Sequence, residues 1–307
     1  MRFRADLAAI WPDERGRLGI AVSGGPDSLA LLLLAHAAMP GRIEAATVDH
    51  GLRPESTDEA AMAAGVCRAL GVEHATLRVG LAAGNLQSAA RTARYAALES
   101  WSRERGLDAL ATAHHADDQA ETLLMRLNRA SGVAGLAGVR ARAQVPGSDL
   151  PLLRPLLGWR RAELQPVLDT AGVPAAQDPS NRDERFDRVR LRRALERADW
   201  LDVAALARSA GHLADADAAL DWAAAREWDE RVEERERGYR YRPGAPRAVR
   251  LRVLAKAIRL LGGDARGGAV AQLEDALTCG SSANCGGVLG RSVGDGWLLE
   301  PEPPRKA

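Results

Sequence analysis

Lysine is almost absent from this sequence. The 307 residues include 42 basic side chains, but the only lysines are Lys256 and Lys306. Before Lys256, therefore, no lysine is available to bind a phosphate group or to act as a nucleophile, and arginine, backbone N–H groups or a metal ion must supply positive charge. The formal net charge is only +1. Any surface that binds a polyanion must then be a local patch.

Cysteine and long apolar runs are also scarce. The three cysteines, Cys67, Cys279 and Cys285, form no C-x-x-C pair, which argues against a zinc site and favours a reduced, intracellular protein. The apolar run 29–38 is too short to span a bilayer, and the N-terminus lacks the apolar segment of a signal peptide. We therefore expect a cytoplasmic protein without a membrane anchor.

Strand-like and helix-like segments alternate in the first part of the chain. The predicted strands are 18–22, 43–49, 73–79 and 107–113, and the predicted helices between them are 29–38, 57–70 and 86–105. This alternation predicts an α/β fold, with a parallel sheet and helices on both of its faces. Residues 150–157 contain two prolines and are expected as an edge or crossing segment.

The composition changes after residue 200 to alanine-rich helical segments. We therefore expect a catalytic domain over 1–204 and a smaller, mainly helical domain over 205–307. Within the second domain, charges balance over 226–242, which predicts an exposed helix. Glycines in 286–299 predict a small hairpin.

A glycine turn joins the first predicted strand to its helix. The turn consists of Ser23, Gly24, Gly25, Pro26, Asp27 and Ser28. Free N–H groups and the helix dipole make such a turn an anion site, and phosphate is the usual anion. Its spacing is neither G-x-x-x-x-G-K-[ST] nor G-x-G-x-x-G. An ordinary connecting turn is the alternative interpretation.

Two further polar clusters follow predicted strands. The first runs from Asp49 through His50 to Arg53, and the second contains His114, His115, Asp117, Asp118, Glu121 and Thr122. Because ligands bind at the carboxyl ends of parallel strands, we expect these clusters and the glycine turn to converge. Asp117 and Glu121 share a helix face.

The oxygen-rich second cluster suits Mg²⁺ beside a nucleotide, or the ammonium group of a cationic substrate. Helix capping alone is an alternative explanation for Asp117 and Asp118. A zinc site is disfavoured because the H-E-x-x-H spacing is absent.

Arginines gather in two places. Arg91 and Arg94 share a face of the predicted helix 86–105 and either contact phosphate or form a solvated surface. Residues 182–197 contain seven arginines and four acids, a net charge of +3, which favours binding to a phosphate backbone, with a solvated helix face as the alternative. The glycine-rich segment 131–138 predicts either a loop over the site or a plain connector.

Taken in order, these motifs resemble the tRNA(Ile)-lysidine synthase family of PP-loop ATP pyrophosphatases. The glycine turn resembles the PP-loop. It is followed by the clusters at 49–53 and 114–122, and then by Arg154-Pro155-Leu156-Leu157 and Asp178-Pro179-Ser180-Asn181. The resemblance covers the first predicted domain and departs from the family at Val189, where asparagine is usual, and at Ala130, where glycine is usual. The length suits the short form of the family.

The resemblance implies a two-step ligation of free lysine to the wobble cytidine of tRNA(Ile) with a CAU anticodon. The cytidine C2 oxygen attacks the α-phosphate of ATP, pyrophosphate leaves, and the lysine amine displaces AMP. ATP, Mg²⁺, free lysine and tRNA are the implied ligands, and the second domain is expected to bind tRNA. A monomer and a homodimer both remain open.

Several site residues follow from the same resemblance. The catalytic residues are Asp27, Arg94, Glu121 and Arg188. The ATP-binding residues are Ser23, Gly24, Gly25, Pro26, Asp27, Ser28, Asp49 and His50. The substrate-binding residues are His114, Asp117, Asp118, Glu121 and Asn181. The Mg²⁺ ligands are Asp27 and Asp118.

Two other functions fit part of the sequence. A PP-loop tRNA thiolase shares the glycine turn, but those acting on cytidine usually need a paired cysteine motif. A non-catalytic RNA-binding module would account for the arginines of 182–197, but it gives no reason for the carboxylates to converge.

Overall fold

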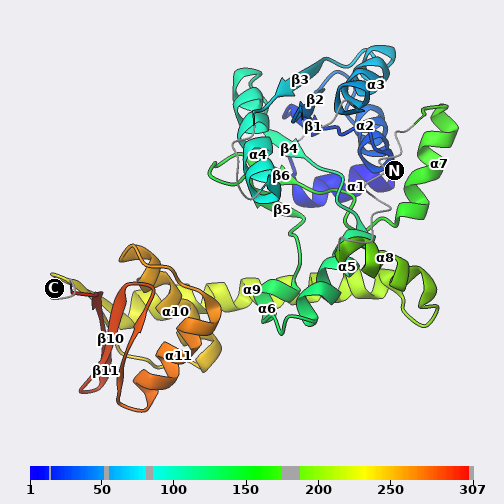
Figure 1. Ribbon diagram of the computed structural model, residues 1–307. Coiled ribbons are helices and arrows are strands. Elements are labelled where there is room, and N and C mark those ends of the chain that lie inside the picture. The colour runs from blue at the N-terminus through cyan, green and yellow to red at the C-terminus, as the bar shows by residue number, and fades with distance from the viewer. Residues whose placement is uncertain (14, 52–54, 81–85, 175–186, 304–307) are drawn as a thin grey trace. The chain divides into compact units, whose positions relative to one another are not determined.

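The computed structural model describes residues 1–13, 15–51, 55–80, 86–174 and 187–303. The chain forms two compact units, Met1–Ala214 and Asp215–Ala307. A long helix, α9, covers Val203–Arg231 and contains the boundary between the units. Each unit has its own sheet (Figure 1).

The first unit is built on a six-stranded sheet in the order β3-β2-β1-β4-β6-β5. All neighbouring strands are parallel except β5, which is antiparallel to β6. The strands are β1 Leu18–Ala21, β2 Ile43–Asp49, β3 His74–Arg78, β4 Ala109–Ala111, β5 Arg142–Gln144 and β6 Pro151–Leu153. The helices before α9 are α1 Arg2–Ile10, α2 Pro26–Ala38, α3 Glu55–Ala69, α4 Leu86–Glu104, α5 Ala116–Leu127, α6 Val133–Leu136, α7 Arg161–Ala171 and α8 Asp187–Arg197.

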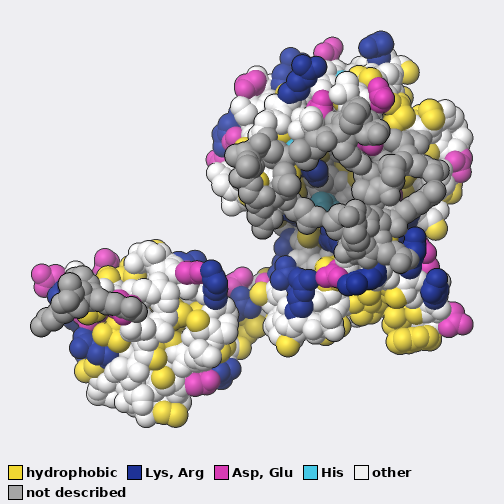
Figure 2. Space-filling view, viewed as in Figure 1, with side chains coloured by type: hydrophobic (Ala, Val, Ile, Leu, Met, Phe, Trp, Pro, Cys, Tyr) yellow, Lys and Arg dark blue, Asp and Glu magenta, His cyan; other side chains and the backbone are white. Residues whose placement is uncertain are grey.

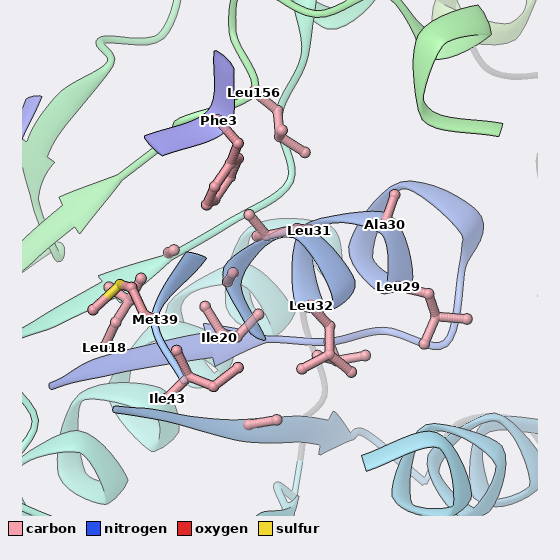
Figure 3. Close-up of a cluster of buried hydrophobic side chains, with 14 of the residues drawn as sticks. Phe3, Leu18, Ile20, Leu29, Ala30, Leu31, Leu32, Met39, Ile43 and Leu156 are labelled. Atoms are coloured by element: carbon pink, nitrogen blue, oxygen red, sulfur yellow. The ribbon is translucent and has the colours of Figure 1, made fainter. Parts of the chain in front are cut away.

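Helices cover both faces of this sheet, as the sequence predicts. On one face, Phe3 of α1 and Leu29 and Leu32 of α2 pack with Ile20 in a core cluster (Figure 3). On the other face, Tyr95, Leu98 and Trp101 of α4 pack on alternate strand residues such as Leu110. Successive residues of β4 therefore enter different cores, which is why this strand is apolar throughout.

β6 corrects the expectation of an edge or crossing segment. It pairs with β4 on one side and with β5 on the other. Pro151 is tolerated because it is the first residue of the strand, and Pro155 follows the last. The strand therefore lies inside the sheet despite its prolines.

The strand order fixes where a ligand can bind. From β1 the chain builds outward through β2 to β3 and then returns to place β4 on the opposite side of β1. The loops after β1 and β4 thus leave the sheet in opposite directions and open a crevice at the carboxyl ends of these strands. The glycine turn follows β1, and the cluster of 114–122 follows β4.

The second unit combines the end of α9 with two helices and a five-stranded antiparallel sheet. The sheet order is β7-β8-β11-β10-β9. The elements are β7 Val232–Arg235, β8 Gly238–Tyr241, α10 Arg247–Leu260, α11 Gly267–Thr278, β9 Ser282–Cys285, β10 Val288–Val293 and β11 Gly296–Pro301. Tyr241, Leu254 and Leu299 are fully buried in its core.

The β10–β11 pair confirms the predicted hairpin, and the other three strands were not predicted. The expectation of a helix over 226–242 was wrong beyond Arg231, because β7 and β8 form a hairpin there. Gly238 explains the difference: a Cβ atom would lie 1.9 Å from the carbonyl oxygen of Leu299. The close approach of β11 thus requires glycine at that position.

Ala130 is strained. Its φ is +51°, the one positive value at a non-glycine residue in the described part of the chain, and it occupies the place where the resembled family usually has glycine. We expect Ala130→Gly to raise the free energy of unfolding by about 0.5–1 kcal/mol, because relief of the left-handed strain exceeds the added chain entropy. Urea unfolding measures this change. Ala134→Gly, in the right-handed helix α6, is the matched control and should destabilise; equal signs for both variants would contradict the strain.

Candidate active site

The glycine turn after β1 is folded by its own two serines. Ser28 Oγ accepts a hydrogen bond from Ser23 N–H at 3.1 Å and donates one to the Gly25 carbonyl at 2.9 Å. Gly25 is the N-cap of α2, and Pro26 begins the helix. Proline suits this position because the first helical N–H has no partner within the helix. The two serines therefore fix the turn directly before the N-terminus of α2.

Gly24 is required by both its conformation and its surroundings. Its φ is +80°, and a Cβ atom would lie 3.1 Å from the carbonyl oxygen of Glu59 on α3. A larger residue would be strained and would push α3 away from the turn. Gly24 thus lets the chain reverse sharply beneath α3.

His115 connects the glycine turn to α5. Its Nδ1 accepts from Asp117 N–H at 3.2 Å, while the Asp118 carboxylate accepts from His115 N–H at 3.1 Å, which together form a capping box. On the other side of the ring, Nε2 lies 3.3 Å from Asp27 Oδ2. The predicted convergence of the turn with this cluster is therefore present.

The carboxylates around His115 set its charge. Burial alone would lower the pKa of His115, but Asp117, Asp27 and Asp118 surround the ring and raise it to about 9. When the ring is charged, Nδ1 carries a proton and can no longer accept the capping hydrogen bond from Asp117 N–H. It then faces the carboxylate oxygen Asp117 Oδ2 at 3.4 Å. Burial would likewise raise the pKa of Asp27, but His115, with Arg161 and Arg192 nearby, holds it below its ordinary value. Asp27 is thus ionised at neutral pH.

Asp117 joins α5 to α7. Arg160 donates to its carboxylate from Nε at 3.2 Å and from Nη2 at 3.0 Å, and Arg161 N–H donates to Oδ2 at 2.8 Å. The Arg161 side chain then reaches back, with Nη2 3.4 Å from His115 Nε2 and 3.7 Å from Asp27 Oδ2. Sequence reasoning missed both arginines, although the scarcity of lysine made arginine one of the three expected sources of positive charge.

Glu121 is paired with an arginine of α8. Its side chain is 1% exposed, and Arg192 Nε donates to Oε1 at 2.7 Å. Arg188, one turn earlier on α8, donates to Thr122 Oγ1 at 3.3 Å. The arginine-rich segment therefore does approach the site, through a side chain, Arg192, that sequence reasoning had not singled out.

His114 faces a different environment from that of its neighbour. Burial, together with the charges of Arg154, Arg91 and Arg188, lowers its pKa to about 4, against the opposing effect of Asp118. Its Nδ1 lies 3.0 Å from Thr112 Oγ1. His114 is therefore neutral at physiological pH, while His115 is charged.

The polar cluster at the end of β2 lies next to another arginine, Arg94. Asp49 Oδ1 accepts from Gly51 N–H at 2.9 Å, and His50 Nε2 lies 3.4 Å from Arg94 Nη2. Burial and the Arg94 charge lower the pKa of His50. The neutral ring accordingly accepts from the guanidinium.

The structure brings most of the predicted site residues to one edge of the sheet. Figure 2 shows a hollow in the first unit with a histidine side chain inside it, and arginine side chains around α5 and α8. Asp117 and Glu121, predicted to act together, have separate arginine partners. Asn181 and its Asp-Pro-Ser-Asn motif lie outside the described residues, as does the segment 182–186.

The described residues lack two features of other classes of protein. Within 1–13, 15–51, 55–80, 86–174 and 187–303, no group of three or more His, Cys, Asp or Glu side chains is arranged to hold a metal ion. Across the same ranges, no helix combines the length and apolarity that crossing a membrane requires.

Comparisons with known proteins agree with this geometry. Residues 2–198 match the PP-loop domain family. The tRNA(Ile)-lysidine synthase of Novosphingobium aromaticivorans is 48% identical over 311 aligned positions, covering 100% of this chain and 94% of that protein. The protein of the same name from Zymomonas mobilis is 40% identical, covering 95% of this chain and 90% of that protein.

Among solved structures, the U34-tRNA thiolase NcsA from Methanococcus maripaludis has a TM-score of 0.56 at 18% identity, over 69% of this chain and 77% of that chain. This likeness establishes the shared fold alone. The family follows from the sequence relatives, whose similarity extends across both units. The chain belongs to the tRNA(Ile)-lysidine synthase family of PP-loop proteins.

Proposed function

We propose that this chain ligates free lysine to the wobble cytidine of tRNA(Ile) with a CAU anticodon, in the cytoplasm and at the expense of ATP. The observation that carries the proposal is the contact between the glycine turn and the acidic start of α5, where Asp27 and His115 meet at 3.3 Å. A phosphate site alone needs no such carboxylate group beside it. An enzyme that activates a base with ATP and then binds a cationic amine needs both a phosphate site and carboxylates beside it.

The glycine turn would receive the triphosphate. Backbone N–H groups at the start of α2 and the positive end of its dipole favour phosphate oxygens. Ser23 and Ser28 hold this turn closed, and Gly24 permits its shape. Asp49, the last residue of the neighbouring strand β2, and His50, which follows it, are proposed to border the nucleotide.

Mg²⁺ is proposed at Asp27 and Asp118. Asp27 Oδ1 is buried and has no hydrogen-bond partner among the described residues, so one carboxylate oxygen is left for a cation. Both carboxylates face the same edge of His115. Because two protein ligands suit Mg²⁺ that also binds phosphate and water, the residues present fit the ion. When bound, the ion would neutralise charge on the leaving pyrophosphate.

The first step would form a bond between the cytidine C2 oxygen and the α-phosphorus and break the bond to pyrophosphate. Arg94 and Arg188 are proposed to hold nucleotide or RNA phosphate during this step. His114 is proposed to contact the base, because its neutral ring can donate or accept a hydrogen bond. In the second step the lysine nitrogen attacks C2, AMP leaves with the former C2 oxygen, and the amine gives up a proton.

The lysine ammonium is proposed to bind at Glu121 and Asp118. Glu121 is buried, yet its partner is the guanidinium of Arg192, so this pocket already accommodates one positive charge. Lysine would replace that guanidinium. Asp117, predicted for the same role, accepts from Arg160 and Arg161 with both of its oxygens, and we assign it to holding α7.

The tRNA is proposed to lie along α5 and α8. Arg126, Arg129, Arg188 and Arg190 are exposed on these helices or directly after them, and Asp187 pairs with two of the four. Such a local excess of arginine suits a phosphate backbone. The second unit, which carries none of the predicted site residues, is proposed to bind the body of the tRNA.

One assay distinguishes this proposal from a thiolase and from a non-catalytic RNA-binding module. The protein is incubated with ATP, labelled lysine and a transcript of the isoleucine tRNA. We expect label in the RNA, and none when the wobble cytidine is replaced by uridine. Release of pyrophosphate only with a sulfur donor would favour a thiolase, and binding of RNA without ATP turnover would favour the module.

A further inference from the structure

Three helices begin at the same point of the crevice. α2 begins at the glycine turn, and α5 and α7 begin beside it, because Ala116 N–H donates to the Trp159 carbonyl at 2.8 Å. Each helix start contributes partial positive charge. The charged side chains at this point therefore determine which ligand binds, and Arg161 Nη2 lies 3.7 Å from Asp27 Oδ2, beside the charged His115.

Asp117 positions Arg161, and both of its carboxylate oxygens accept hydrogen bonds. Asp117 accepts from Arg160 on one side and from the Arg161 backbone N–H on the other. These bonds fix the first residue of α7 against the first turn of α5. The Arg161 guanidinium is thereby held 3.7 Å from Asp27 and remains 39% exposed, directed at the glycine turn.

The other arginine near Asp27 is not equally available. Arg192 is tied to buried Glu121 at 2.7 Å, and its own side chain is 22% exposed. Arg161 has weaker side-chain contacts, at 3.4 Å to a histidine nitrogen and 3.7 Å to a carboxylate. An incoming phosphate oxygen can therefore replace these contacts at little cost.

We propose that Arg161 is a catalytic residue that binds the β- and γ-phosphates of ATP and stabilises the charge of the departing pyrophosphate, with Asp117 and Arg160 as its positioning residues. The inference rests on the proposed function. The role of Arg161 also agrees with the scarcity of lysine. Because no lysine precedes Lys256, an arginine would perform the task that a lysine performs in other phosphate sites. Its planar group can donate two parallel hydrogen bonds, whereas an ammonium group cannot.

The test measures single-turnover pyrophosphate release from ATP with the CAU tRNA. Arg161→Ala should slow release by roughly 10²–10³-fold, with tRNA affinity within twofold of wild type, and added guanidinium ions should restore part of the rate. Arg161→Lys should recover only part of the activity. Asp117→Asn should slow release less than Arg161→Ala and should not respond to guanidinium. Arg68→Ala, an exposed arginine of α3, is the matched control and should be unchanged.

Several outcomes would overturn the inference. Wild-type release by Arg161→Ala would remove Arg161 from the reaction, and full activity of Arg161→Lys would refute the proposed role of its planar guanidinium. A slow Arg161→Ala protein that melts earlier, binds tRNA poorly and gains nothing from guanidinium would assign a structural role instead. Failure of the wild-type chain to incorporate lysine, in contrast, would refute the proposed function itself.

Discussion

Replacing Asp27 by alanine is expected to abolish pyrophosphate release, with a loss of roughly 10³-fold or more. Asp27 is the carboxylate of the glycine turn itself, and one of its oxygens is buried without a hydrogen-bond partner in the described part of the chain. The substitution removes the proposed metal ligand and one of the carboxylates that balance the charges of His115 and Arg161. The affinity for tRNA should change less than twofold, because the exposed arginines of α8 are untouched.

Release of labelled pyrophosphate and filter binding of tRNA measure the two effects separately. Asp58→Ala is the matched control, since Asp58 is an exposed acid on α3. Turnover at the wild-type rate by Asp27→Ala would contradict the assignment of this site. Loss of tRNA binding together with turnover would indicate that the variant has lost its fold, which circular dichroism would detect.

Glu121→Gln is expected to raise the KM for lysine by roughly 30–100-fold, because a charge-assisted hydrogen bond to the ammonium group is lost. The KM for ATP should stay within twofold, since Glu121 is paired with Arg192 and not with the glycine turn. Steady-state incorporation of labelled lysine at varied lysine and ATP concentrations separates these constants.

Two control variants test the expected effect of Glu121→Gln. Glu196→Gln changes an exposed acid of α8 and should leave both constants unchanged. Because Glu121→Gln leaves Arg192 without its carboxylate, Glu121→Gln with Arg192→Met tests whether the unpaired charge alone causes the effect. An unchanged KM for lysine in both variants would exclude Glu121 from the ammonium site.

Much of the first unit was predictable because its central strands β1, β2 and β4 are buried on both faces. The runs that became β1 and β4 are short and apolar, β2 is longer and mostly apolar, and helices of the right length separate the strands, so the α/β class follows from the pattern. β6 was misjudged because a proline at the first position of a strand costs no ladder bond. In the second unit, β7 and β8 are short and charged, and their pairing depends on the close approach of β11 at Gly238.

The sequence predicts where the candidate site lies, but it does not predict which side chains pair with one another there. The convergence of Asp27 with His115 follows from the rule that ligands bind at the carboxyl ends of strands. The partners of Asp117 and Glu121 do not follow, because Arg160 and Arg192 come from helices far along the chain whose docking no local pattern encodes. The scarcity of lysine and the arginine-rich segment 182–197 indicated that arginines could enter the site, but not which ones.

The central claim is that the cytidine itself is activated by ATP and then attacked by lysine. A tRNA carrying ¹⁸O at the C2 carbonyl of the wobble cytidine tests this directly, with mass spectrometry of the released AMP and of the modified nucleoside. The account predicts that AMP gains the ¹⁸O and that the nucleoside loses it and gains a lysine residue. Unlabelled AMP, with ¹⁸O kept in the nucleoside, would contradict it.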